Sequence, residues 1–216
     1  MIVPGRLADL WAARHDTRGM SAVEFALALP LLMFMGLGGL EVANMALANS
    51  RVNQIAIALA DNASRMKQQT IGSAPHFRES DAVEALLAAE RQGGDLQLMQ
   101  NGRAILSSLQ VNPDGGQWIK WQRCRGTKTT YSSNWGAEGT GATGTAFTGI
   151  GSGTKTIAAE PQSAIMVAEV VYEYRPLIVD SIFDTMTIRK YAAMYVRDER
   201  DLSQIYASPP TVASTC

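Results

Sequence analysis

The sequence has few of the side chains from which catalytic and metal sites are usually built. It contains two histidines, His15 and His76, and two cysteines, Cys124 and Cys216, among 216 residues. The cysteines form no C-x-x-C pair, and no cluster of His and Cys has metal-ligand spacing. A hydrolase would also need a nucleophile, a base and a group that orients the base. We therefore expect no enzymatic activity, no bound metal and no cofactor.

Concentrated positive charge is also missing. No run of Lys and Arg occurs, and the formal net charge is −1. Nucleic-acid phosphates are bound by concentrated basic surfaces, so we expect no nucleic-acid partner. Gly139, Gly141 and Gly144 formally match a dinucleotide fingerprint, but the strand, helix and downstream acid that it requires are not evident.

One long apolar run dominates the N-terminal part of the chain. No charged side chain occurs from Phe25 to Leu40. As a helix, Met20 to Glu41 would extend roughly 33 Å at about 1.5 Å per residue, close to the thickness of a bilayer core. We therefore expect residues 20–48 to insert into a membrane. Pro30 lies inside the run and should kink the helix, because it removes a backbone donor.

The beginning of the run is unusual because Glu24 lies at its edge. An acidic side chain there is costly in lipid and is seldom retained without a partner or a role. Three interpretations are open. The segment is a plain anchor, or a secretory signal cut after the small-x-small stretch 46–48, or a prepilin-like segment cut between Gly19 and Met20 on the cytoplasmic side.

The third interpretation gives each of these residues a physical reason. A small residue such as Gly19 before the scissile bond lets a membrane peptidase close around the backbone. Cleavage would create a positive amine on Met20, four residues from Glu24. In a filament, the amine of one subunit would neutralise the carboxylate of its neighbour. Like other buried ion pairs, this pair would set register more than it adds stability.

The string GMSAVEFALALP, residues 19–30, resembles the processing site of the TadE/TadF-like minor pilins, or pseudopilins, of the tight-adherence (Flp) pilus system. The pair Glu24-Phe25 is characteristic of that branch, and residues 164–197 are similar, far less specifically, to its C-terminal strands. The resemblance implies cleavage between Gly19 and Met20 and a role of Glu24 and Phe25 in assembly. The partners it implies are a prepilin peptidase, other pilin or pseudopilin subunits, the inner-membrane assembly platform and the lipid bilayer.

We expect three parts: a cytoplasmic leader at 1–19, a transmembrane pilin-like helix at 20–48 and a periplasmic α+β domain at 49–216. This makes a single-pass protein of a bacterial inner membrane, which stays at the pilus base or enters the surface filament. The first helix should continue beyond the membrane, because an apolar stripe runs from Val52 to Met66 at helical spacing. This stripe packs on the protein's own domain or on another subunit.

Local patterns predict the other elements. We expect a short helix at 80–92, a hairpin of 104–111 and 117–124 around the turn 112–116, and a strand pair at 163–175 and 186–197. Together they predict a small antiparallel sheet of about four strands packed on the first helix, a pilin-like lollipop.

Several details of this domain are further expectations. Trp118 and Trp121 alternate across one strand, so at least one should face outward, and Glu169 should also face outward. Residues 126–156 contain eight glycines and nine threonines, which predicts a flexible polar excursion outside the core. The tail 203–216 looks loosely held. If the chain is exported, Cys124 and Cys216 would form one disulfide.

The leading functional hypothesis is a non-enzymatic pilus-assembly subunit. A membrane-anchored periplasmic binding or adhesion module, not cleaved at the leader, is the alternative. Its basis is the Gly/Thr-rich segment, in which Tyr131, Trp135 and Phe147 would present aromatic rings to a surface.

Overall fold

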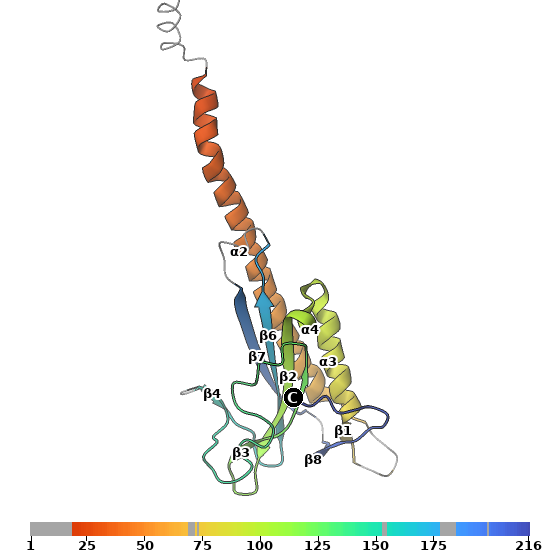
Figure 1. The fold of residues 1–216 in the computed structure, drawn as a ribbon. Coiled ribbons are helices and arrows are strands. Elements are labelled where there is room, and N and C mark those ends of the chain that lie inside the picture. Colours follow the sequence, from red (N-terminus) through yellow and green to blue (C-terminus); the bar gives the residue numbers. More distant parts are fainter. Residues whose placement is uncertain (1–18, 69–71, 73, 153–154, 178–184, 198) are drawn as a thin grey trace, which may run out of the picture. The chain divides into compact units, whose positions relative to one another are not determined.

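The computed structural model describes residues 19–68, 72, 74–152, 155–177, 185–197 and 199–216, so residues 1–18 of the expected leader lie outside the described residues. The chain divides into two compact units, Met1–Asn44 and Met45–Cys216. The expected α+β class is confirmed: a long helix is followed by a small domain with a further helix and a four-stranded antiparallel sheet (Figure 1).

Helix α2 extends without interruption from Met20 to Arg65 and includes Pro30. Its first half belongs to the first unit, where large apolar side chains such as Leu27 and Phe34 are exposed. Its second half belongs to the second unit and carries the predicted stripe, of which Val52 and Leu59 are almost completely buried. The stripe therefore packs on the protein's own domain.

The short helix expected at 80–92 is α3, Glu79–Gly93. It follows a three-residue strand, β1, His76–Arg78. The Asp81 carboxylate accepts a hydrogen bond of 2.9 Å from the backbone N–H of Arg78 and so satisfies a donor at the helix N-terminus. A 3-10 turn, η1 (Gly94–Leu96), and a short helix, α4 (Leu98–Asn101), lead into the sheet.

The sheet consists of four antiparallel strands in the order β3-β2-β6-β7. These strands are β2 (Gly102–Val111), β3 (Gln117–Arg125), β6 (Ala164–Tyr174) and β7 (Met186–Tyr195). Both the expected hairpin and the expected strand pair are confirmed. One face of the sheet contributes Leu106, Met166 and Val170 to the main hydrophobic core, together with α2 and α3.

The interpretation of the two tryptophans is wrong because the β2–β3 ladder contains a bulge. Trp121 pairs with Ser108, whereas Trp118 pairs with Gln110, so the register shifts by one residue between them. Ser108 and Gln110 are two positions apart on β2 and share a face, which places both tryptophans on that face. Trp121 is buried and stacks on Phe77 with 5.3 Å between ring centroids.

The second face of the sheet is covered by the Gly/Thr-rich segment. Within it, Ile150 is only 1% exposed and packs with Leu109, Ile165 and Val167 in a second hydrophobic cluster. The segment also contains β4 (Ile150–Ser152), which pairs with β5 (Lys155–Ile157). The expectation that 126–156 lies outside the core is therefore wrong, since a few apolar side chains among the glycines anchor it.

The burial of Glu169 is a second consequence of this cover. It faces away from the main core, as the alternation predicts, but it is only 1% exposed, so its expected outward position is wrong. Its carboxylate accepts hydrogen bonds from the Ser133 hydroxyl, from the backbone N–H of Asn134 at 3.2 Å and from Arg189 at 3.2 Å. The segment thus buries an acidic side chain and supplies the donors that this burial requires.

The tail is also more ordered than expected. Strand β8 (Asp201–Tyr206) pairs in parallel with β1. Farther on, the backbone N–H of Cys124 donates to the carbonyl of Ser214 at 2.7 Å, and a disulfide joins Cys124 to Cys216. The expectation of a loosely held tail is wrong, because a short strand and a covalent bond fix it to the domain.

Candidate processing and assembly site

The expected cleavage site lies at the beginning of α2. Gly19 immediately precedes the helix, and its carbonyl accepts the backbone N–H groups of Ala22 and Val23, both at 3.1 Å. A Cβ atom added to Gly19 would meet nothing within 4 Å, and the backbone there lies outside the left-handed region. Any residue would therefore fit at position 19, so the described fold gives no reason for a glycine.

The residues expected to act in assembly lie in the first two turns of α2. Glu24 is exposed, and Phe25 is 61% exposed. None of the described residues forms a hydrogen bond or an ion pair with the Glu24 carboxylate. Within this unit, the acid and the aromatic ring are thus both available to a partner.

The segment around them has the dimensions of a membrane span. Among the described residues, α2 is the one helix that is long and apolar enough to cross a bilayer. The most apolar stretch of this helix is not buried within the protein. Apolar side chains in such number are rarely left to water. This long apolar helix indicates single-pass membrane anchoring.

The glycine motif considered for nucleotide binding has a structural role instead. Asn112, in the β2–β3 turn, is 4% exposed and donates from its side-chain nitrogen to the carbonyls of Gly141 and Gly144, at 2.8 and 2.7 Å. Its side-chain oxygen accepts the backbone N–H groups of Asp114 and Gly116. Gly141 has a positive φ of 76°, and a Cβ there would lie 2.3 Å from the carbonyl oxygen of Gln117. The glycines therefore dock the loop on the hairpin.

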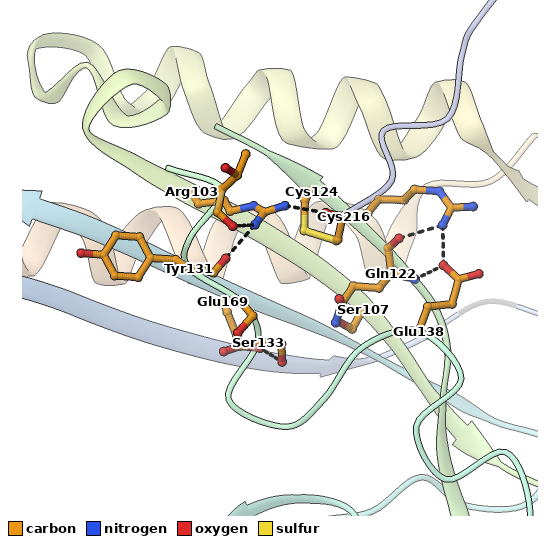
Figure 2. Close-up of a disulfide and its surroundings, with 12 residues drawn as sticks. Arg103, Ser107, Gln122, Cys124, Tyr131, Ser133, Glu138, Glu169 and Cys216 are labelled. Carbon is orange, nitrogen blue, oxygen red and sulfur yellow. Dashed lines mark hydrogen bonds and ion pairs between the residues drawn. A yellow bond between two sulfur atoms is a disulfide. The ribbon is translucent and has the colours of Figure 1, made fainter. Parts of the chain in front are cut away.

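Buried polar groups around the disulfide hold the loop and the tail to the sheet (Figure 2). Arg103 on β2 is 5% exposed and donates to the carbonyls of Thr129, Tyr131 and Cys216 at 2.7, 2.8 and 3.0 Å. Sequence reasoning missed Arg103, because an arginine in a strand pattern gives no sign of what it will bind.

A second ionic cluster ties α3 to β3 and to the loop. Arg123 is 6% exposed, and its Nε donates to Glu79 at 2.8 Å, while its Nη1 donates to Glu138 at 2.8 Å. The hydrogen bond to Glu79 is the main cause of the raised pKa of Arg123, so the guanidinium stays charged. Gln122 beside it donates to Ser107 at 3.0 Å (Figure 2). These contacts are structural and gather no nucleophile with a base.

The domain also has a polar cleft of about 400 Å³, lined in part by Lys120, Gln162 and Asp201. Burial lowers the pKa of Lys120, whose Nζ donates to the Leu202 carbonyl at 2.8 Å. In the described part of the chain, no group of three or more His, Cys, Asp or Glu residues has the arrangement of a metal site. The cleft combines no residues that we recognise as a catalytic set.

The aromatic residues of the adhesion hypothesis are engaged within the domain. Trp135 and Phe147 pack on the second hydrophobic cluster, and Trp135 meets the ring of Tyr191 edge-on at 5.0 Å. The Tyr131 hydroxyl donates to Glu173 at 2.9 Å. These rings do not form an exposed platform, so that hypothesis loses its structural basis.

The chain was compared with protein families, curated proteins and solved structures. The model of a family described as TadE-like protein matches residues 19–61, which comprise Gly19, Glu24, Phe25 and most of α2. No curated protein and no solved structure matches the chain. The resemblance inferred from residues 19–30 is therefore confirmed for the N-terminal segment, which is the part of the chain that the family model covers.

Proposed function

Because residues 19–61 are TadE-like, we propose that the chain is a minor pilin or pseudopilin that a prepilin peptidase processes for assembly of a tight-adherence pilus. In this proposal, residues 1–19 are a cytoplasmic leader, residues 20–48 cross the inner membrane, and residues 49–216 form the periplasmic domain. The polypeptide itself performs no chemistry, and Gly19 is a substrate position.

The observation that carries the proposal is the combination of Gly19 and Glu24 at the entry of an exposed apolar helix. Glycine before a helix is normally explained by a positive φ or by a close backbone approach, and Gly19 has neither. A peptidase that closes around the backbone supplies the missing reason. Glu24 similarly has no partner among the described residues, and an amine released on Met20 would supply one.

The partners of this subunit follow from the same geometry. A helix whose large apolar side chains are exposed from Met20 to Leu40 must be covered by lipid before assembly and by other helices afterwards. We therefore propose a lipid bilayer, other pilin or pseudopilin subunits and an inner-membrane assembly platform as successive surroundings of α2.

The test is the N-terminus of the mature protein in its native host. We expect mass spectrometry to find Met20 as the first residue, and Gly19→Leu to abolish this cleavage while membrane insertion persists. Gly38→Leu is the matched control, because Gly38 also lies in open space on α2 but far from the scissile bond, and it should be processed normally. A mature protein beginning at Asn49, or one that retains its first nineteen residues, would contradict the proposal.

A further inference from the structure

The two edges of the four-stranded sheet differ in how they are covered. Strand β3 forms one edge and β7 the other. Other parts of the chain accept hydrogen bonds from the backbone N–H groups of four residues of β3. The N–H groups of Gln117 and Ile119 donate to the carbonyls of Phe147 and Thr140 at 3.0 and 2.9 Å. Farther along β3, the N–H of Gln122 donates to the Glu138 carboxylate at 3.0 Å, and that of Cys124 donates to the carbonyl of Ser214 at 2.7 Å.

The opposite edge has no such backbone partners among the described residues. The backbone N–H of Val196 donates to Ala164 at 2.9 Å, which places Val196 and every second residue before it toward β6. The alternate residues therefore direct their backbone groups away from the sheet. They are Thr187, Arg189, Tyr191, Ala193 and Tyr195. No other described residue forms a backbone hydrogen bond with these five on their outer side.

This edge lacks most of the features that usually prevent strand addition. The ten residues of β7 pair with β6 in a continuous register without a bulge, and they include neither proline nor glycine. Tyr191 and Tyr195 are 54% and 47% exposed. A long edge without a bulge and with exposed aromatic side chains is a template for another strand. In Figure 1, β7 is the dark blue strand at the border of the sheet.

We propose that the edge of β7 binds an extended segment of a different protein, which adds to the sheet as a fifth strand. Main-chain hydrogen bonds to the five outward-facing residues would supply affinity, and alternate side chains would supply specificity. The proposal rests on the proposed function, because the choice of partner below assumes that α2 is anchored in a membrane.

A second copy of this chain fits the edge poorly. The edge of β3 is already covered by other parts of the chain, so it is not available for a head-to-tail contact with β7. If two β7 strands paired in an antiparallel arrangement, a two-fold axis normal to the sheet would relate the two copies. Strand β7 runs in the same direction as α2, and Arg200, beyond its end, donates to the carbonyl of Ala63 near the end of α2 at 3.1 Å. The two-fold axis would therefore point the Met45 ends of the two helices in opposite directions, although both must lead into one membrane.

The chemistry of the edge describes the incoming strand. Arg189 is paired with Glu169 at 3.2 Å, but no described carboxylate pairs with Lys190, which lies in the middle of β7. Directly opposed charges stabilise a cross-strand pair. We therefore expect a segment with an acidic side chain opposite Lys190 and with apolar or β-branched side chains next to Tyr191 and Tyr195.

The experiment uses the full-length protein in its native membrane, with a photo-crosslinking amino acid in place of Tyr195. We expect adducts that map to an extended segment of another protein. This segment should have an acidic side chain at the position opposite Lys190. Tyr191→Pro removes an outward N–H and should reduce the adducts about tenfold, whereas the matched control Tyr191→Ala retains the N–H and should give at most about a twofold loss.

Lys190→Glu provides a second variant that leaves the backbone unchanged, in case proline disturbs folding; it should also reduce the adducts. Adducts with a second copy alone, no adducts, or adducts insensitive to both Tyr191→Pro and Lys190→Glu would overturn the proposal. Mature N-termini are measured on the same samples. Cleavage at Met20 without adducts refutes the strand addition alone, whereas absent cleavage refutes the proposed function.

Discussion

At the scale of single residues, Glu24 is the side chain whose role is most open to experiment. Its carboxylate is exposed near the beginning of an apolar helix. If it pairs with the amine of Met20 in a neighbouring subunit, Glu24→Gln should leave cleavage unchanged but weaken assembly. Breaking a buried ion pair costs about 3 kcal/mol or more, so incorporation should fall about a hundredfold. Quantitative immunoblotting of isolated pili and of assembly complexes measures this loss.

Glu24→Asp is the matched control for this prediction, because it retains the charge and shortens the side chain by one methylene. We expect it to restore part of the assembly. Wild-type incorporation of Glu24→Gln would remove the proposed role of the charge.

Residue-level inference from sequence reaches residues whose pattern is local and fails where a role depends on distant partners. Gly19 and Glu24 are recognisable as a pattern because they lie five residues apart at the beginning of one helix, and the family match includes both, whereas their roles stay predictions. Glu169 has the alternation of an outward residue, but a loop far away in sequence buries it. Asn112 was placed correctly in a turn, whereas its bonds to Gly141 and Gly144 required the folded loop.

At the scale of elements, strand β8, which pairs with β1, carries a carboxylate that accepts hydrogen bonds within the strand. Hydrogen bonds from the Tyr206 hydroxyl, which has the larger effect, and from Ser203 lower the pKa of Asp201 to about 2. Because the folded pKa lies below the usual value of about 3.9, ionised Asp201 contributes stability above about pH 4. This contribution is lost as the pH falls from about 4 through 2.

Asp201→Asn should therefore lower the thermal unfolding midpoint of the protein at pH 7, and the difference from the wild type should shrink as the pH falls toward 2. Thermal unfolding of the detergent-solubilised protein, followed by circular dichroism across this range, measures it. A constant difference between wild type and Asp201→Asn at all pH values would contradict the assignment.

The elements that sequence reasoning recovered are those with a long periodic pattern. The stripe from Val52 onward, the strands of the sheet and the helix α3 all bury one side, so their periodicity is visible. Strand β1 has only three residues and β8 six, which is too short for a clear alternation. The bulge between Trp118 and Trp121 escaped notice because a one-residue register shift leaves no mark in composition.

At the scale of the whole molecule, the two faces of the sheet are covered by different means. Helices α2 and α3 cover one face with regular apolar stripes. A glycine-rich loop covers the other with a few apolar contacts, and buried polar groups such as Arg103 and Asn112 hold it in place. A loop of this kind has no period, and this explains why its place in the core was not predicted.

The disulfide between Cys124 and Cys216 connects the C-terminal tail to the edge of the sheet, across 92 residues of sequence. Cross-linking so long a loop restricts the unfolded chain, so a Cys124→Ser/Cys216→Ser double variant should lose about 2–4 kcal/mol of stability. Urea unfolding of the detergent-solubilised protein measures the loss. The tail should nevertheless stay near β3, because Arg103 and the Cys124 N–H still bind its carbonyls. Hydrogen exchange would then report faster exchange in 207–216 while β2 and β6 remain protected; an unchanged unfolding midpoint would show that the covalent bond adds nothing to these hydrogen bonds.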